Sequence, residues 1–372
     1  MTSVHEPVPA SQPQPASPAP VENWQQFLTF HGNGKELFII FLKNFFLSIL
    51  TLGIYSFWGR VRTRKFLWAN TRLWGEPFEY TGTGRELFVS FLIVMVFFII
   101  GSIGFSLLQL MLPPVGSIIL SFCIMLGLFY LMQFATYRAL RYRLSRTKWR
   151  GIRGNLGGKA NHYACRALLY TPVIICSLGL LAPWVISRMV GYIVNNVHFG
   201  NHAMQFSGKA KGLYKIFIIN IAVLIGLSAL AFGAFSSFLP SFNTSHEFPS
   251  TGGLLMMFSP FLAVLLAYFL FSSFLHAALT RWFFHGLAFR EVHMRSTLEG
   301  STLLHTRLYN LLLVICTVGL GYAWAYVRTL RVTMNSTQSC GDPQLASLLQ
   351  DTLPAPKRGE GLLEALDLDL SL

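Results

Sequence analysis

The sequence predicts an all-α, polytopic integral membrane protein with two transmembrane helical hairpins and three repeated Gly-Trp-Arg elements that re-enter or span the bilayer. Its 372 residues are 53% hydrophobic and only 12% charged, whereas soluble domains carry about 25% charged residues. Seven apolar segments contain no Asp or Glu, because a bare carboxylate in hydrocarbon costs several kcal/mol. A third observation, an internal repeat, sets the organisation.

The repeat is an apolar segment with a central glycine, a tryptophan foot and a trailing arginine. The first copy is Leu50-Thr-Leu-Gly-Ile-Tyr-Ser-Phe-Trp58, the second is Cys176-Ser-Leu-Gly-Leu-Leu-Ala-Pro-Trp184, and the third is Cys316-Thr-Val-Gly-Leu-Gly-Tyr-Ala-Trp324. The matching residues are Gly53, Gly179 and Gly319, then Trp58, Trp184 and Trp324, then Arg62, Arg188 and Arg328. An aromatic foot followed by a cation is typical of a membrane interface.

In chain order the apolar segments cover residues 37–58, 87–112, 115–137, 163–186, 213–239, 253–276 and 303–327. Pro113 and Pro114 join the second segment to the third, and residues 240–252, without Lys or Arg, join the fifth to the sixth. At about 1.5 Å per residue, each of these four segments exceeds the roughly 30 Å hydrocarbon core. These four segments are expected to be firm transmembrane spans. If the three motif segments also cross the bilayer, the number of spans is seven.

Outside these segments the chain is polar. We expect a disordered, proline-rich tail over residues 1–26. Its start has neither the cations nor the apolar run of a signal peptide. Residues 27–335 form a single polytopic membrane domain built from three internal repeats, at about 30–88, 156–214 and 298–342. Residues 336–372 are expected to form a cytoplasmic tail, which ends in an acidic, leucine-rich stretch.

The charge distribution selects between two topologies. If all seven segments cross, successive motif copies carry their trailing arginines to opposite faces. If only the two hairpins cross, and the motif segments dip in and return, every Lys and Arg outside an apolar segment lies on one side. The positive-inside rule favours the second topology, and it predicts that both tails are cytoplasmic.

A second repeated pattern leads into three apolar segments. It occurs as Phe30-His-Gly-Asn-Gly-Lys-Glu-Leu-Phe38, as Tyr80-Thr-Gly-Thr-Gly-Arg-Glu-Leu-Phe88 and, more loosely, from Phe206 to Tyr214. Glycine-flanked amides at a helix start can attract phosphate, but a helix cap at the membrane surface with a snorkelling cation is the favoured interpretation.

Polar residues inside the motif segments form the candidate intramembrane site. They are Lys43, Asn44, Arg166, Arg307 and Asn310. Broken apolar segments, internal repeats and buried polar groups are features that transporters use at their binding sites. The first hypothesis is therefore transport or permeation of a small solute.

The alternative is a non-catalytic membrane module that binds anionic lipid or a protein partner. The net charge is +14, and the cations flank apolar spans rather than a soluble basic domain, which argues for lipid headgroups and against nucleic acid. Candidate headgroup contacts lie in the most basic connection, at Arg141, Arg143, Arg146, Lys148, Arg150 and Arg153.

Nothing in the sequence supports catalysis. No Gly-x-Ser-x-Gly elbow occurs, and no cysteine stands beside a histidine in a polar setting. His198 and His202 have a spacing that metals use on a helix, but a surface turn is the better interpretation of Phe-Gly-Asn between them. We expect no catalytic residue, cofactor, metal or disulfide.

Three stretches carry a resemblance to a known family, namely Thr51-Leu-Gly-Ile-Tyr55 with Trp58, then Asn70-Thr-Arg-Leu-Trp-Gly75, and Phe78-Glu-Tyr-Thr-Gly82. They resemble the YjgN family of bacterial inner-membrane proteins, whose members have no established function. The resemblance extends from about residue 27 to 341. It is weakest in the third copy, where Ser336 replaces Asn70. Membership implies a multi-pass protein of the inner membrane and transfers no catalytic residue.

Overall fold

The computed structural model describes residues 23–237 and 251–343, so most of the tails expected over residues 1–26 and 336–372, and nearly all of the 240–252 connection, lie outside it. The described parts of both tails include strands, at Gln25–Gln26 and Thr337–Cys340. Within the described ranges, eleven short antiparallel strands form one sheet in the order β1-β11-β10-β9-β8-β7-β6-β5-β4-β3-β2. The strands are β1 (Gln25–Gln26), β2 (Leu28–Phe30), β3 (Thr71–Leu73), β4 (Glu76–Tyr80), β5 (Thr147–Trp149), β6 (Ile152–Leu156), β7 (Val197–Phe199), β8 (His202–Phe206), β9 (Leu287–Phe289), β10 (Val292–Ser296) and β11 (Thr337–Cys340).

The prediction of an all-α protein is therefore wrong. Helices dominate, but the polar connections between the apolar segments are strands rather than loops. Each strand has only two to five residues, which is too short for an alternating apolar pattern to stand out in the sequence.

The sheet nearly closes into a barrel at its N-terminal segment. Its two end strands, β1 and β2, are separated by Phe27 alone, yet β1 pairs with β11 and β2 pairs with β3. The Trp74 amide also donates to the Phe27 carbonyl at 2.6 Å. Residues 25–30 thus bridge the first and last parts of the chain, and both edges of the sheet end there.

Tight two-residue turns join neighbouring strands of the sheet. Trp74 and Gly75 between β3 and β4, and Arg150 and Gly151 between β5 and β6, all have positive φ. Positive φ at both central residues defines the type I′ turn, whose twist matches that of paired strands.

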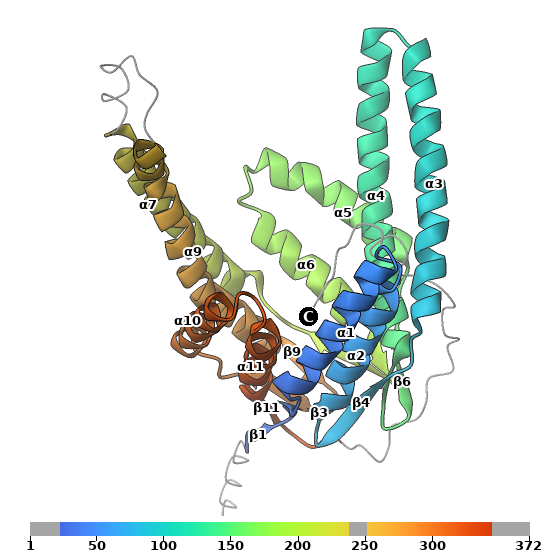
Figure 1. The fold of residues 1–372 in the computed structure, drawn as a ribbon. Helices are drawn as coiled ribbons and strands as arrows, with labels where there is room; N and C mark the ends of the chain where they lie inside the picture. The colour runs from blue at the N-terminus through green and yellow to red at the C-terminus, as the bar shows by residue number, and fades with distance from the viewer. Residues whose placement is uncertain (1–22, 238–250, 344–372) are drawn as a thin grey trace, which may run out of the picture.

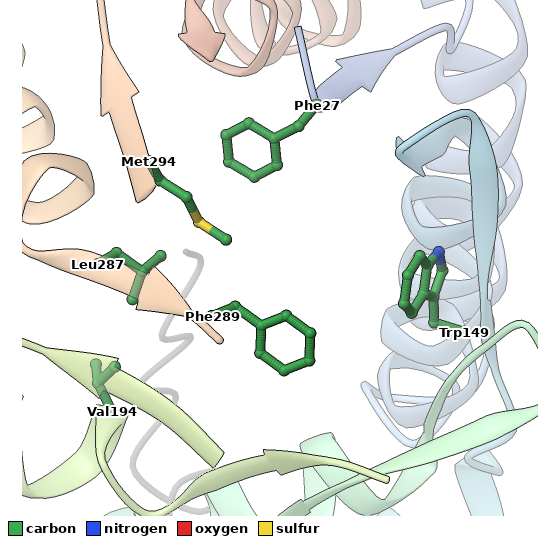
Figure 2. Packing of buried hydrophobic residues seen from close by; sticks show 6 residues of the cluster. All are labelled: Phe27, Trp149, Val194, Leu287, Phe289 and Met294. Atoms are coloured by element: carbon green, nitrogen blue, oxygen red, sulfur yellow. The ribbon is translucent and has the colours of Figure 1, made fainter. Parts of the chain in front are cut away.

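Apolar side chains fill the interior of the ring of strands. Figure 2 shows this cluster, with Trp149 on β5, Leu287 and Phe289 on β9 and Met294 on β10, together with Phe27 between β1 and β2 and Val194 at the end of α6. Further aromatic residues pack against this cluster, among them Trp74, Phe199 and Phe206. The interior of the ring is therefore a packed core.

Helical hairpins connect the successive strand pairs. In the described residues they are α1 (Gly34–Leu50) with α2 (Ser56–Asn70), α3 (Gly84–Met111) with α4 (Pro114–Arg146), α5 (Ala160–Cys176) with α6 (Ala182–Val194), α7 (Ala210–Ser236) with α9 (Thr251–His285), and α10 (Gly300–Cys316) with α11 (Tyr322–Asn335). Figure 1 shows these hairpins rising from one side of the sheet. A strand–helix–helix–strand unit thus occurs five times, with short and long hairpins alternating along the chain.

The hairpins stand in a closed ring, like the strands. Each hairpin packs against the next through α2 and α3, α4 and α5, α6 and α7, and α9 and α10, and α11 returns to α1. One position in the first turn of each first helix is buried at these junctions, namely Leu37, Leu87, Tyr163, Leu213 and Leu303. Repetition of one junction closes the ring.

Four helices are long and apolar enough to cross a membrane among the residues that the structure describes. They are α3, α4, α7 and residues Phe258–His285 of α9, as the sequence predicts. At most about a tenth of each apolar window is buried within the protein, so these two long hairpins present their surfaces to lipid.

Candidate functional site

The three motif copies form the three short hairpins, and their glycines form the turns. Gly53, Gly179 and Gly319 have φ of 89°, 85° and 90°, and each follows a residue that also has positive φ. The glycine amide donates back into the preceding helix, as from Gly53 to the Ser48 carbonyl at 2.7 Å. The chain therefore reverses inside each motif.

Hydroxyl groups reinforce the same turn in all three hairpins. The hydroxyl of Thr51 accepts from the Tyr55 amide at 2.9 Å, that of Ser177 from the Leu181 amide at 3.2 Å, and that of Thr317 from the Gly321 amide at 2.7 Å. The exposed residue beside each glycine is apolar, with Leu52 94%, Leu178 92% and Val318 92% exposed. Ordered turns with apolar tips suit insertion into a lipid leaflet.

The motif tryptophans join the hairpins to their neighbours. A Cβ added at Gly84 would lie 2.7 Å from Cγ of Trp58, and one at Gly34 would lie 2.5 Å from Cδ1 of Trp324. Trp184 instead meets the ring of Tyr170 in its own hairpin, with centroids 5.4 Å apart. Two of the three tryptophans thus explain why the next helix begins with glycine.

The glycine-rich lead-ins are helix caps. The Asn33 side chain accepts from the Lys35 amide at 3.0 Å, and the Thr83 hydroxyl accepts from the Glu86 amide at 3.4 Å. The first glycine of each lead-in lies under the preceding aromatic ring, since a Cβ at Gly82 would sit 2.6 Å from the ring of Tyr80. Packing and capping account for the pattern.

Asn44 and Asn310 of the predicted intramembrane site play one equivalent role. The Asn44 amide donates to the Gly59 carbonyl at 3.1 Å, and the Asn310 amide donates to the Ala325 carbonyl at 3.0 Å. Each bond joins the two helices of one short hairpin. The Asn310 oxygen accepts from Arg328 at 3.3 Å, whereas the Asn44 oxygen is buried without a partner.

The three cations of that set lie on three different hairpins. Arg166 stacks over the ring of Tyr192 at 4.7 Å, Arg307 donates to Ser272 Oγ at 2.7 Å, and Lys43 is exposed. No hydrogen bond or ion pair in the described residues joins any two of the five members. The structure therefore distributes them over the ring.

The tyrosine under Arg166 belongs to a cluster of aromatic rings at the junction of α4 with α5. The Tyr192 ring lies 6.0 Å from that of Tyr163, and its hydroxyl donates to the Lys159 carbonyl at 3.0 Å. Burial raises the pKa of the Tyr163 hydroxyl. Tyr163, one helical turn before Arg166 on α5, is therefore neutral at physiological pH.

The trailing arginines of the motif all stack on aromatic rings. Arg62 lies 5.8 Å from the ring centroid of Tyr55, Arg188 lies 5.5 Å from that of Trp184, and Arg328 lies 3.9 Å from that of Tyr309. Such stacking orients a guanidinium group and leaves its edge donors available.

Arg141 and Arg146, among the six cations predicted to meet lipid headgroups, bind groups at the junctions between units. Arg141 donates to the carbonyls of Gly157 and Gly158 at 2.7 and 2.6 Å, and Arg146 pairs with Glu86 at 2.7 Å. Arg281 and Arg331 bind the lead-in carbonyls of Leu298 and Gly32 in the same way. These arginines stabilise unit junctions.

The other four cations lie at or next to the β5–β6 hairpin. Arg150 is exposed in its turn, Lys148 is half-buried opposite Glu79, and Arg143 and Arg153 are half-buried with partners within the protein.

His198 and His202 lie on paired strands across a turn, and the described residues contain no group of three or more metal-binding side chains.

Sequence reasoning places repeats at about residues 156 and 298 but misses the lead-in pattern at these two of the five unit starts. The lead-in recurs before α5 as Leu156-Gly-Gly-Lys-Ala160 and before α10 as Ser296-Thr-Leu-Glu-Gly300. Both are hard to recognise because Leu156 and Ser296 stand where the other lead-ins have an aromatic residue. The shared signal is a small residue at the helix start, three positions before the buried residue of the junction.

Comparison with known proteins finds relatives without an established activity. The family described as "Bacterial protein of unknown function (DUF898)" matches residues 25–365. The chain is 26% identical to Inner membrane protein YjgN of Salmonella typhimurium, covering 90% of this chain and 93% of the relative. It is 33% identical to the Escherichia coli K12 protein of the same name over 33% of this chain and 29% of the relative. No solved structure matches.

Proposed function

Because the chain belongs to the DUF898 family of bacterial proteins of unknown function, we propose from its geometry that it is a non-catalytic membrane module that binds anionic phospholipid. It is a multi-pass protein of the inner membrane, in keeping with the four apolar helices of the described chain and with its relatives. The lipid it binds lies in the cytoplasmic leaflet.

One observation carries this proposal. Every helical hairpin of the described chain starts and ends on the same ring of strands. The cations of the strands, their turns and the sheet ends of the helices therefore share one side. The positive-inside rule assigns that side to the cytoplasm, where anionic lipids attract basic groups by about 1 kcal/mol per cation.

The helical surface supports a lipid ligand over a small polar solute. The long hairpins are apolar, and the rest of the protein covers almost none of their apolar surface. The tips of the short hairpins are apolar as well. Acyl chains are the natural neighbours of such a surface, because it offers them contacts and offers water few hydrogen bonds.

Transport of a small solute is the second candidate, and the closed ring of helices favours it. Two features weaken it. Apolar side chains fill the ring of strands, and α1 is 11 residues shorter than α3, with 17 and 28 residues. The tips of the short hairpins thus end roughly 16 Å before those of the long hairpins. Beyond that level only two described hairpins remain to wall a pathway.

Reconstitution into vesicles tests the two candidates together. We expect the purified protein to enrich phosphatidylglycerol over phosphatidylcholine among its bound lipids, and vesicles that contain it to release a trapped small solute no faster than empty vesicles. Solute release that Arg166→Ala and Asn310→Ala abolish, without lipid enrichment, would instead establish transport.

A further inference from the structure

In each short hairpin, one Lys or Arg of the first helix and one Arg of the second lie at a similar height above the sheet. The pairs are Lys43 with Arg62, Arg166 with Arg188, and Arg307 with Arg328. Each cation is six to nine residues away from the end of its helix that meets the sheet. This places all six at about 9–14 Å above the ring of strands. We call these six residues the cation belt.

The belt members of one hairpin lie near a contact that joins its two helices. Arg166 stacks on Tyr192, which stands four residues after Arg188 on α6. Arg307 lies one helical turn before Asn310, and the Asn310 oxygen accepts a hydrogen bond from Arg328. Lys43 is adjacent to the Asn44 that binds Gly59, three residues before Arg62. The two positive charges of each hairpin therefore lie at the level of one contact between its helices, and Arg307 also donates to Ser272 on α9.

No acidic partner of the six is seen within the described chain. Five of them contact aromatic rings, hydroxyl groups or an amide oxygen. Four of the six are exposed, and Arg307 and Arg328 are half-buried. A ligand that supplies negative charge would provide the counter-ion that the described chain does not place beside these cations.

Helix lengths identify the plane of the belt. The long helices α3 and α7 have 28 and 27 residues, or about 40 Å each, which leaves close to 30 Å beyond the belt. That remainder equals the hydrocarbon thickness of a bilayer. On α4 the apolar run likewise ends at Arg138, eight residues before the helix ends at Arg146. The belt therefore lies at the level of the lipid phosphates.

The short hairpins extend a shorter distance beyond the cation belt than the long hairpins do. From Lys43 to Leu50 is about 10 Å, and from Arg166 to Cys176 is about 15 Å. These lengths match the hydrocarbon of one leaflet, and the exposed residues along them are apolar, as at Phe45, Phe46 and Leu169. Phosphate at the belt and acyl chains along the tips are the two parts of one phospholipid.

We propose that each short hairpin binds the phosphate of one anionic phospholipid between its two belt cations, with the acyl chains lying along its apolar tip. Stacked guanidinium groups present their edge donors to phosphate oxygens. This inference rests on the proposed lipid binding and locates it on the short hairpins rather than at the β5–β6 connection.

The test counts the phosphatidylglycerol molecules that the intact, purified protein retains in native mass spectrometry. We expect up to three for the unaltered protein, and one fewer for Arg166→Gln/Arg188→Gln and for Lys43→Gln/Arg62→Gln. Arg166→Lys/Arg188→Lys, which keeps both charges, should retain most of the binding. The matched control, Lys148→Gln/Arg150→Gln at the sheet, should retain all three. Thermal unfolding in detergent verifies that each variant is folded.

One outcome overturns the inference while the proposed function stands, namely an unchanged count in both belt variants. Displacement of the retained lipid by millimolar inorganic phosphate would identify a free anion as the ligand, and it would overturn both the inference and the proposed function. If the unaltered protein shows no preference for phosphatidylglycerol over phosphatidylcholine, both the inference and the proposed function fail.

Discussion

Single glycines in this protein serve two different purposes. Gly53, Gly179 and Gly319 supply a φ near 90° that side chains with a Cβ rarely adopt. Gly34 and Gly84 have ordinary backbone angles and make room for a tryptophan of the neighbouring hairpin. The motif therefore specifies the reversal of one hairpin and its docking against the next.

The turn glycines can be tested apart from steric effects. Gly53→Ala should lower the stability by about 1 kcal/mol or more, because the new Cβ meets open space but the backbone conformation is strained. Gly104→Ala is the control, since Gly104 lies inside α3 and also faces open space. It should leave the melting temperature in detergent unchanged or slightly higher. Equal losses in both variants would contradict this role of the φ.

A paired carboxylate distinguishes two similar lead-ins. Glu86 binds the Tyr142 hydroxyl and the Arg146 guanidinium, whereas Glu36, at the same position of the first lead-in, is exposed. Glu86→Gln should destabilise the protein by about 1–3 kcal/mol, because it removes the ion pair of a half-buried arginine. Glu36→Gln should change the melting temperature little. An equally small effect at Glu86 would mean that the junction does not depend on this pair.

At the scale of the element, the long helices could be predicted and the strands could not. A span of more than twenty apolar residues has few alternatives, so the two long hairpins follow from composition. Strands of two to five residues are defined by partners distant in the chain, as β1 pairs with β11. The tight turns, such as Trp74-Gly75, are the local sign of these strands.

Lists of candidate residues proved less informative than their spacing. The repeated glycine, tryptophan and arginine fall at equivalent places in three hairpins. The intramembrane polar set mixes two kinds of residue, asparagines that link helices and cations without acidic partners. Sequence shows which residues recur, but only packing shows whether a polar group is already bonded.

The depth of the short hairpins can be measured with native cysteines. Cys176 and Cys316 end α5 and α10 at the tips, and Cys340 lies on β11 in the sheet. In single-cysteine variants, we expect an impermeant maleimide to label Cys340 in inverted membrane vesicles and to label neither tip cysteine from either side. Denaturing detergent should expose all three. Labelling of Cys176 in intact cells would mean that its hairpin crosses the membrane.

At the scale of the whole molecule, the N-terminal segment closes two rings at once. Phe27 is 4% exposed between β1 and β2 and packs in the core of the strand ring. The neighbouring Gln26 donates to the Asn335 carbonyl at the end of α11. First and last units are thereby held together, so closure depends on residues at both ends of the described chain.

Phe27→Ala should therefore be among the most damaging single substitutions. We expect a loss of about 3–5 kcal/mol from the cavity and the weakened closure, seen as a lower melting temperature. Phe46→Ala provides the control, because Phe46 is 61% exposed on a short hairpin. Removal of residues 1–22, which precede the described chain, should have little effect. Stability equal to that of Phe46→Ala would argue that the ring holds without this residue.

The central claim, that every hairpin returns to one ring on one side of the membrane, is tested most directly by two cysteines introduced one at a time. Arg150→Cys lies in the β5–β6 turn and Asn201→Cys in the β7–β8 turn, on either side of the α5–α6 hairpin. An impermeant thiol reagent should reach both in inverted vesicles and neither in intact cells. Labelling of the two cysteines from opposite sides would show that this hairpin crosses the bilayer and would contradict the account.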